Sequence, residues 1–346
     1  MRQAGLKIAI LFDTWDDGVE EPTGPEAPPP AGARKSKAPP PKLDREEIFE
    51  ALAELGHHPS YLEVDGHDPS LLAVARCNAD LIFNLTESYA GDDTKDVHLA
   101  AYLELLDKPY TGADPHGLYL AQDKSLAKKL FAFHKIRTPV FAVSYDGELG
   151  DARDIGFPLI VKPIAEDGSI GIEAASVVRS VRELKERIRQ VHREFGSPAL
   201  IEEYIEGREI YAAILGEQEP EALPLVEMDL SGLPRGVPKI ASSEVKWEKG
   251  SEIYQRVRSS VVEDLDEKLV EKIQERAIAA YRALKLRDYG RIDLRLTPRG
   301  GIYVLEGNPN PWLSSGAEFA MAALASGRSY TEMLREIVDL AMARYA

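Results

Sequence analysis

Two segments near the C-terminal end of the chain place charged side chains inside apolar, strand-like runs. In GRIDLRLT, which covers residues 290–297, Arg291 and Asp293 alternate with Ile292 and Leu294. Successive side chains of a strand point to opposite faces, so the arginine and the aspartate share one face and the apolar residues line the other. The alternation predicts a strand with one buried face and one polar face.

The next segment, YVLEGNPNP, continues this pattern. Residues 303–305 read as the end of a buried strand, and Glu306 and Asn308 follow them closely. Turn chemistry at a strand end is the ordinary explanation for such residues. Together with Asp293, however, they supply three oxygen ligands on what look like adjacent antiparallel strands, and Mg²⁺ takes such ligands. We therefore predict a metal site at this strand end, followed by a turn that the prolines hold rigid.

A lysine inside another apolar run points to phosphate chemistry. Lys162 stands in FPLIVKP, residues 157–163, and the loop that follows contains Gly168, Ser169 and Gly171. A lysine that reaches solvent at a strand edge is the ordinary explanation, because burying it without a partner is costly. Glycines between strands, however, let backbone amides turn toward phosphate oxygens. The lysine and the loop together favour a nucleotide phosphate site.

Strand and helix patterns alternate along the chain in the α/β manner. We expect strands at residues 6–12, 58–64, 80–85, 138–143, 157–163, 173–178, 199–205, 208–216, 223–230, 290–297 and 301–306. We expect helices at residues 44–56, 94–106, 123–135, 181 to about 193, and 262–286. Asp44 is the expected N-cap of the first helix and Gly56 its C-cap.

Two segments lack hydrophobic periodicity. The first, at about residues 21–42, is rich in Pro, Ala and Lys and is predicted to be a flexible surface insertion. The second, at residues 231–256, is predicted to be a long loop that contains Lys246 and Trp247. Because long loops in compact domains are often active-site lids, we expect a lid here.

Composition excludes several classes of protein. A length of 346 residues suits two or three domains. A net charge of -16 argues against a nucleic-acid partner, and no apolar run approaches the ~20 residues of a membrane span. The single cysteine, Cys77, cannot form an internal disulfide and fits a reducing compartment. We therefore expect a cytoplasmic protein with no membrane partner.

In order and spacing, the segments resemble the ATP-grasp superfamily and, within it, the D-alanine–D-alanine ligase family over nearly the whole chain. The resemblance rests on KPYTG followed by QDK, on FPLIVKPIAEDGSIGI, on LIEEYIEGREIYAAILG, and on YGRIDLRL continuing to YVLEGNPNP. It implies an α/β, ATP-grasp fold with an N-terminal parallel α/β domain at residues 1–121. A small central subdomain at residues 122–198 and a C-terminal subdomain at residues 199–346 would follow.

Enzymes of this family transfer the γ-phosphoryl group of ATP to a carboxylate, and an amine then attacks the acyl phosphate. The resemblance therefore implies ATP, two Mg²⁺ ions with Mn²⁺ as an alternative, and small-molecule carboxylate and amine substrates. It also implies a homodimer.

The resemblance gives each matched position a role. The residues expected to hold the phosphates of ATP are Lys124, Lys162, Lys246 and the loop with Gly168, Ser169 and Gly171. Those expected around the base and ribose are Glu202 at the adenine amino group, the backbone of Glu203 and Ile205, and Glu209 at the ribose hydroxyls. Asp293, Glu306 and Asn308 would bind the metal ions, while Arg291, Lys246 and Gly171 would act in catalysis. Phosphoryl transfer mainly needs positioning and charge neutralisation, which these groups supply.

The substrate end of the chain departs from the family. D-alanine ligases carry two glycines after the first strand and a glutamate shortly beyond, whereas FDTWDDGVEEP lacks the glycines and offers Asp16, Glu20 or Glu21. The family's serine in the glycine loop falls at Gly168, and its lid tyrosine falls at Trp247.

A further departure follows the metal motif. The family continues there with Pro-Gly and a serine that binds the second carboxylate, whereas residues 311–315 read PWLSS. The reaction class is therefore better supported than the substrate.

Three hypotheses remain open. The first is an ATP- and Mg²⁺-dependent carboxylate–amine ligase whose substrates are not two D-alanines. The second is a genuine D-alanine–D-alanine ligase or a variant that accepts a hydroxy acid. The third is a nucleotide-binding protein without ligase activity, which the presence of Arg291 beside the metal motif disfavours.

Overall fold

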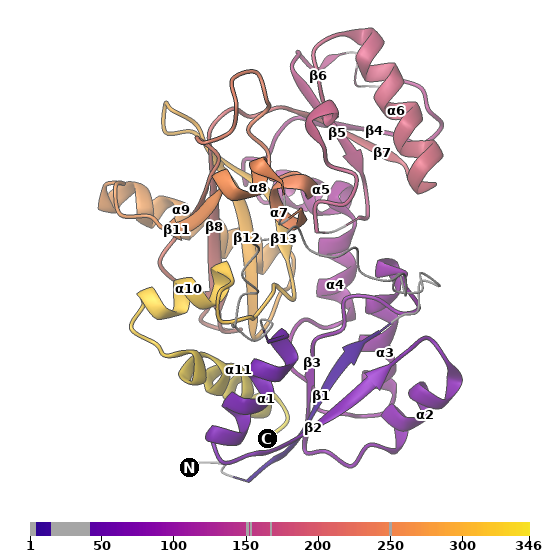
Figure 1. Cartoon of the computed structure of the whole chain (residues 1–346), viewed down its shortest axis with the longest axis vertical. Helices are drawn as coiled ribbons and strands as arrows, with labels where there is room; N and C mark the ends of the chain where they lie inside the picture. The colour runs from indigo at the N-terminus through magenta and orange to yellow at the C-terminus, as the bar shows by residue number, and fades with distance from the viewer. Residues whose placement is uncertain (1–4, 15–41, 150–151, 153, 167, 249–250) are drawn as a thin grey trace, which may run out of the picture.

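The computed structural model describes residues 5–14, 42–149, 152, 154–166, 168–248 and 251–346. Asp16, Glu20, Glu21 and, apart from Lys42, the predicted proline-rich insertion lie outside these residues. In the described part the chain forms three sheets, one parallel and two antiparallel. Figure 1 shows the parallel sheet at the bottom and the two antiparallel sheets above it. The predicted α/β class with an N-terminal parallel sheet is confirmed.

The parallel sheet has the strand order β2-β1-β3. Its elements are β1 (Lys7–Asp13), β2 (His58–Val64) and β3 (Leu81–Asn84), with α1 (Asp44–Glu54), α2 (Asp68–Arg76), η1 (Asp93–Lys95) and α3 (Asp96–Leu105). Both faces of β1 are buried, as parallel sheets require. Ile8 and Ile10 belong to one core with α1, and Ala9 and Leu11 belong to another with α3.

The smaller antiparallel sheet has the order β4-β7-β5-β6. Its elements are β4 (Phe141–Ser144), β5 (Leu159–Pro163), η3 (Ala174–Ser176), β6 (Val177–Val178), α6 (Val181–Phe195) and β7 (Ala199–Glu203). The Ser180 side chain caps the start of α6, and Gly196, at a φ of 59°, ends it. Leu184, Ile188 and Val191 of α6 are buried against one face of the sheet. Each such side chain contributes about 1.5–3 kcal/mol by its burial.

The larger antiparallel sheet has the order β11-β10-β8-β12-β13, with β9 paired to β8. Its strands are β8 (Arg208–Leu215), β9 (Glu221–Ala222), β10 (Val226–Asp229), β11 (Arg258–Val261), β12 (Tyr289–Leu296) and β13 (Ile302–Asn308). The associated helices are α9 (Glu267–Ala283), α10 (Glu318–Ala325) and α11 (Tyr330–Arg344). Ile292 and Leu294 pack with α9, as the alternation in β12 predicts, and Arg291 and Asp293 therefore face away from that helix.

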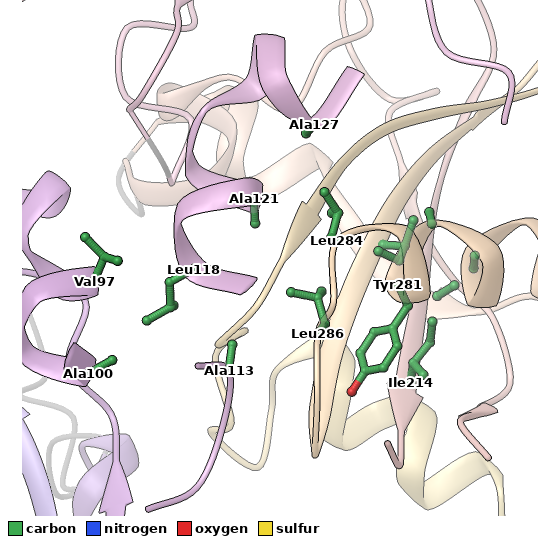
Figure 2. Close-up of a cluster of buried hydrophobic side chains, with 14 of the residues drawn as sticks. Val97, Ala100, Ala113, Leu118, Ala121, Ala127, Ile214, Tyr281, Leu284 and Leu286 are labelled. Atoms are coloured by element: carbon green, nitrogen blue, oxygen red, sulfur yellow. The ribbon is translucent and has the colours of Figure 1, made fainter. Parts of the chain in front are cut away.

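Two consecutive helices connect the parallel sheet to the rest of the fold. They are α4 (Pro115–Gln122), capped by Asp114, and α5 (Lys124–Phe133), capped by Asp123. Figure 2 shows Leu118 and Ala121 of α4 between Val97 of α3 and the residues that follow α9. One continuous apolar core therefore runs from the parallel sheet to the larger antiparallel sheet.

Several local predictions were wrong in detail. Residues 231–256 are not a plain loop, because they contain α7 (Ser243–Trp247) and α8 (Glu252–Arg256). Each of these helices spans only five residues and is too short to show a hydrophobic period. Asp44 is the first helical residue of α1 and not its N-cap.

Other boundaries also shift. The N-cap of α1 is Leu43, whose N–H is bonded to Glu46 at 3.0 Å, and Gly56 follows the C-cap by one residue. The predicted strand at residues 173–178 is mostly the 3-10 turn η3. β7 pairs within the smaller sheet although it lies after residue 198, and the predicted domain boundaries remain predictions.

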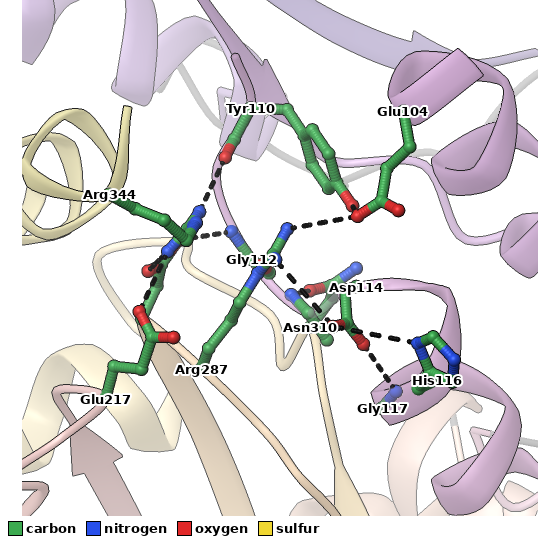
Figure 3. A network of polar contacts seen from close by, with 12 residues as sticks. Glu104, Tyr110, Gly112, Asp114, His116, Gly117, Glu217, Arg287, Asn310 and Arg344 are labelled. Carbon is green, nitrogen blue, oxygen red and sulfur yellow. Dashed lines mark hydrogen bonds and ion pairs between the residues drawn. The ribbon is translucent and has the colours of Figure 1, made fainter. Parts of the chain in front are cut away.

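A buried carboxylate ties the KPYTG segment to the C-terminal helix. Asp288 is fully buried, accepts the Gly112 N–H at 2.8 Å and makes a close ion pair with Arg344 of α11. Arg344 also donates to Tyr110 O at 2.9 Å, and Arg287 donates to Gly112 O at 2.9 Å. Figure 3 shows these arginines converging on Gly112. The parallel sheet, the turn before β12 and α11 are therefore linked at one point.

Asp288→Asn should destabilise the fold by about 3 kcal/mol, because it removes one partner of a buried ion pair. Glu217→Gln is the matched control, since Glu217 pairs with the same Arg344 at 3.3 Å but is 43% exposed. We expect less than about 1 kcal/mol from that change. Urea unfolding of both variants measures the difference. Equal losses would show that Asp288 does not hold these segments together.

Candidate active site

Four charged side chains meet between the two antiparallel sheets. They are Lys128 of α5, Lys162 of β5, Glu202 of β7 and Glu306 of β13. Lys162 Nζ lies 3.0 Å from Glu202 Oε2 and 3.5 Å from Glu306 Oε2, and Lys128 makes a close ion pair with Glu202 Oε1. Lys162 is therefore not a lysine that reaches solvent at a strand edge, because its amine is held between two carboxylates.

The cations keep these carboxylates ionised. Burial alone would raise the pKa of Glu306, but Lys162, Lys124 and further cations hold that pKa well below its usual value. Burial would also raise the pKa of Glu202, and Lys128 and Lys162 together bring it below its usual value. Both side chains are therefore negatively charged hydrogen-bond acceptors at neutral pH.

Strands β12 and β13 bring the predicted metal ligands together. Asp293 pairs directly with Glu306 in the antiparallel register, and Arg291 pairs with Asn308. Directly opposite residues share a face of the sheet, so the two carboxylates lie together. Asn308 Nδ2 donates to Arg291 O at 3.4 Å, which leaves the Oδ1 atom of Asn308 able to bind a metal.

The donor set suits a hard cation. Among the described residues, no three or more His, Cys, Asp or Glu side chains are grouped so that they could hold a metal. The predicted site instead combines two carboxylates with one amide, from Asp293, Glu306 and Asn308. Mg²⁺ binds through one or two carboxylates and completes its shell with water and phosphate oxygens. The residues present therefore fit Mg²⁺.

A β-bulge sets the direction of Glu306. Asp293 pairs with Glu306 but Leu294 pairs with Val304, so Leu305 is an extra residue in β13. Without the bulge, Glu306 would point the same way as Val304, which is buried in the core with α9. The extra residue turns Glu306 to the face of Asp293. The predicted metal site depends on this irregularity.

The guanidinium of Arg291 is held beside the predicted metal ligands by Asp293 and by the ring of Tyr211. Its Nε and Nη2 donate to Asp293 Oδ1 and Oδ2 at 2.7 and 2.9 Å. The guanidinium carbon lies 4.6 Å from the centroid of the Tyr211 ring, and Nη1 lies 4.0 Å from Glu318 Oε2. A guanidinium has five N–H donors, of which Asp293 takes two. The remaining donors can serve another oxyanion.

The glycine loop has left-handed backbone at three of its residues. Gly168, Ser169 and Gly171 have φ values of 60°, 67° and 70°. A Cβ at Gly171 would lie 2.7 Å from Pro163 Cγ, so only glycine fits there. Arg187 of α6 donates to Gly171 O at 2.7 Å and fixes the loop to the smaller sheet. Backbone of this kind can turn amides toward an anion.

Two further lysines, Lys124 and Lys246, act on this loop and on Glu306. Lys124 Nζ donates to Glu166 O at 2.6 Å, in the segment that leads into the loop. Lys246 lies on α7 and is among the cations that lower the pKa of Glu306 against the effect of burial. The side chain of Trp247, predicted to close the site, lies outside the described part of the structure.

The residues predicted around the base and ribose lie on β7, on β8 and between them. Glu202 and Ile205 are buried, and the Glu203 N–H donates to Val140 O at 2.8 Å. Glu209 is buried and forms an ion pair at 2.5 Å with Arg295 of β12. The pairing of Glu209 with Arg295 was not predicted from the sequence.

Arg295 joins three segments at this end of the site. Besides Glu209, it donates to Gly207 O at 2.9 Å and to Lys239 O at 2.8 Å. A cavity of about 450 Å³ opens here, lined in part by Glu209, Met228 and Lys239. Arg295 therefore connects the predicted lid to the β7–β8 connection.

At the predicted substrate end, Ser315 and Glu318 both contact other described residues. Ser315 donates its N–H and hydroxyl to Glu47 of α1, at 2.6 and 2.8 Å. Glu318, at the start of α10, accepts the Ser259 hydroxyl at 2.9 Å and lies near Arg291. Ser315 is therefore engaged by the parallel-sheet region, and a carboxylate stands beside the predicted catalytic arginine.

Sequence reasoning missed several residues of this site, namely Lys128, Arg187, Arg295 and Glu318. Two of them carried a usable signal. Lys128 is four residues after Lys124, on the same helix face. Arg295 continues the alternation of Arg291 and Asp293. Glu318 had no local signal, because its role depends on where α10 packs.

None of the helices in the described residues is long and apolar enough to cross a membrane.

The fold has close solved counterparts. The D-alanine–D-alanine ligase of Bacillus anthracis, solved with ATP, has a TM-score of 0.73 at 21% identity, over 99% of this chain and 98% of that chain. The VanG D-Ala:D-Ser ligase of Enterococcus faecalis has a TM-score of 0.72 at 21% identity, over 97% and 99%. These likenesses confirm the predicted ATP-grasp fold.

Comparison of the amino-acid sequence with known proteins shows the family to which the chain belongs. A protein of Sinorhizobium fredii described as uncharacterized protein y4sG is 31% identical over 98% of both chains. The D-alanine–D-alanine ligase of Aquifex aeolicus is 31% identical over 84% of this chain and 92% of its own length. Residues 148–339 match the family model for the D-ala D-ala ligase C-terminus. The chain therefore belongs to the D-alanine–D-alanine ligase family of ATP-dependent, ADP-forming ligases.

Proposed function

We propose that this protein joins a carboxylate to an amine at the expense of ATP, with Mg²⁺, and that its substrates are not two D-alanines. One observation supports this class of reaction most directly. Arg291 lies opposite Asn308 and Asp293 lies opposite Glu306 on adjacent strands, and Lys162 lies 3.5 Å from Glu306. A pure nucleotide-binding protein has little need for an arginine fixed beside metal ligands.

Each group has a task in the proposed reaction. The substrate carboxylate attacks the γ-phosphorus of ATP, which releases ADP and leaves an acyl phosphate. The amine then attacks the acyl carbon, so that the amide forms and phosphate leaves with its electron pair. Bound Mg²⁺ would neutralise phosphate charge and orient the phosphates. Lys124, Lys162 and Lys246 would neutralise the remaining charge, and the free donors of Arg291 would stabilise the transferring phosphoryl group.

The nucleotide end follows the same proposal. The Glu202 carboxylate would accept a hydrogen bond from the adenine amino group, and the backbone of Glu203 and Ile205 would flank the base. The Glu209 carboxylate would bind both Arg295 and the ribose hydroxyls. The Gly168–Gly171 loop, with Ser169, would cover the phosphates. We further propose two Mg²⁺ ions, with Mn²⁺ as an alternative, a homodimer and a cytoplasmic location.

Three observations support substrates other than two D-alanines. Gly168 offers no hydroxyl where the family has a serine, and both donors of Ser315 are taken by Glu47. Glu318 Oε2 lies 4.0 Å from Arg291 Nη1. Burial would raise the pKa of Glu318, but Arg291 and the backbone amide of Glu318 bring it below its usual value. A free carboxylate on the amine substrate would meet this negative charge.

The second candidate function is genuine D-alanine–D-alanine ligase activity. The relative of that name from Aquifex aeolicus matches 84% of this chain at 31% identity. Both candidates use the same ATP chemistry, so only the substrate separates them.

A screen for ADP release, with D-alanine, other amino acids and small carboxylates as substrates, tests the proposal. We expect D-alanine alone at millimolar concentration to give little D-alanyl-D-alanine, because Gly168 offers no hydroxyl and Glu47 engages both donors of Ser315. Mass spectrometry of the products measures this directly. Efficient formation of the dipeptide would establish the second candidate instead.

Glu306→Gln should abolish ADP formation and leave the fold intact, because it removes one charged metal ligand at a strand end. The matched control is Glu221→Gln, on β9 of the same sheet and 54% exposed. Titration with Mg²⁺ in the presence of ATP, followed by ADP release, measures the effect. Full turnover by Glu306→Gln would remove Glu306 from the metal site.

Arg291→Ala should lower kcat by roughly 10³-fold, by analogy with other arginines that stabilise phosphoryl transfer. Arg291→Lys should restore little, because one ammonium cannot replace a planar fork of donors. Arg258→Ala, at an exposed arginine of β11, is the control and should leave kcat unchanged. A defect confined to the KM for ATP would contradict a role in the chemical step.

A further inference from the structure

Lys128 is a fully buried lysine that the proposed reaction does not use. It lies on α5, one turn after Lys124, with none of its surface exposed. A buried ammonium is tolerated only where its charge and its hydrogen-bond donors are matched by partners. The partners of Lys128 therefore indicate what this lysine does.

All three donors of the Lys128 ammonium are engaged. One contacts Glu202 Oε1 in a close ion pair, one reaches Thr138 Oγ1 at 2.9 Å, and one reaches Leu305 O at 3.1 Å. Leu305 is the extra residue of the β-bulge in β13. Because a bulge leaves its extra residue outside the strand ladder, the lysine supplies a partner for that carbonyl.

We propose that Lys128 is a positioning residue for nucleotide recognition, which fixes the Glu202 carboxylate in the orientation that receives the 6-amino group of the purine base. The proposal rests on the proposed function, which places adenine against Glu202.

Two lysines fix Glu202 from different elements. Lys128 of α5 takes Oε1, and Lys162 of β5 takes Oε2 at 3.0 Å. Each carboxylate oxygen can accept more than one hydrogen bond, so the pair orients the group and still leaves capacity for a ligand. An ionised carboxylate accepts from an amino group but repels the 6-keto oxygen of a guanine or hypoxanthine base. Lys128 therefore favours adenine nucleotides through Glu202.

The same lysine connects the base to the metal site. Its bond to Leu305 O holds the residue directly before Glu306, and its ion pair holds Glu202. A single side chain thus places the proposed base contact and the proposed metal ligand relative to each other.

A merely structural lysine would have a different signature. Its loss would lower stability and weaken all nucleotides equally, or none. A lysine that acts through Glu202 matters only for nucleotides that carry a 6-amino group. Purine riboside 5′-diphosphate, which lacks that group, separates the two roles.

Calorimetric titration of the full-length protein with ADP and with purine riboside 5′-diphosphate, both in excess Mg²⁺, provides the test. For Lys128→Met we expect roughly tenfold weaker ADP binding, the value of about one hydrogen bond to a charged group, with purine riboside diphosphate changed less than about twofold. Lys129→Met, at the exposed neighbouring lysine of α5, should bind both nucleotides as the wild type does.

The remaining outcomes are also decisive. Equal weakening of both nucleotides, or unchanged ADP binding, would overturn the role of Lys128 and leave the proposed function intact. A wild-type protein that binds neither nucleotide would overturn the proposed function itself. Thermal unfolding and circular dichroism verify the fold of each variant. If Lys128→Met does not fold, Lys128→Gln, which keeps a neutral donor, is expected to show the same selective loss of ADP.

Discussion

The ion network of Lys128, Lys162, Glu202 and Glu306 is the constraint on which the rest of the site depends. Two cations and two carboxylates from four elements balance one another between the antiparallel sheets. Removing Lys128 or Glu202, whose side chains are at most 2% exposed, commonly costs about 3–5 kcal/mol, because it leaves an uncompensated buried charge. The site therefore forms only when the two sheets have packed against each other. Once formed, the network holds ionised carboxylates at defined positions before a nucleotide binds.

Local patterns predicted the elements that carry the chemistry but not their final directions. The prediction that Arg291 and Asp293 share one face of β12 was correct, because side chains alternate between the two faces of a regular strand. Glu306 could not be oriented in this way, since the bulge at Leu305 depends on the partner strand. The short helices α7 and α8 are set by serine caps at their first turns, below the length at which periodicity is visible. Lys128 showed a helical spacing from Lys124, but its partners come from distant segments.

The segment predicted to be a lid is anchored at two points of the nucleotide site. Ser243 N donates to Ile172 O at 3.0 Å, just after the glycine loop, and Lys239 O accepts from Arg295 at 2.8 Å. These bonds fix the segment that carries α7 and Lys246, one of the cations that hold the pKa of Glu306 below its usual value. If this segment closes the site as predicted, it would exclude water from reactive intermediates. An acyl phosphate needs such protection, because hydrolysis would waste the ATP.

The two ends of the site are built under different constraints. At the proposed nucleotide end, the positions of Lys162 and Glu202 are fixed by their ion pair, so a change in one disturbs the other. At the predicted substrate end, Glu47 and Ser315 meet across separate regions of the chain, and Glu318 is held by Ser259 and Arg291. Residues there can change without breaking the ion network. The ATP chemistry can therefore persist while residues at the predicted substrate end change, so membership of the family predicts the reaction more firmly than the substrates.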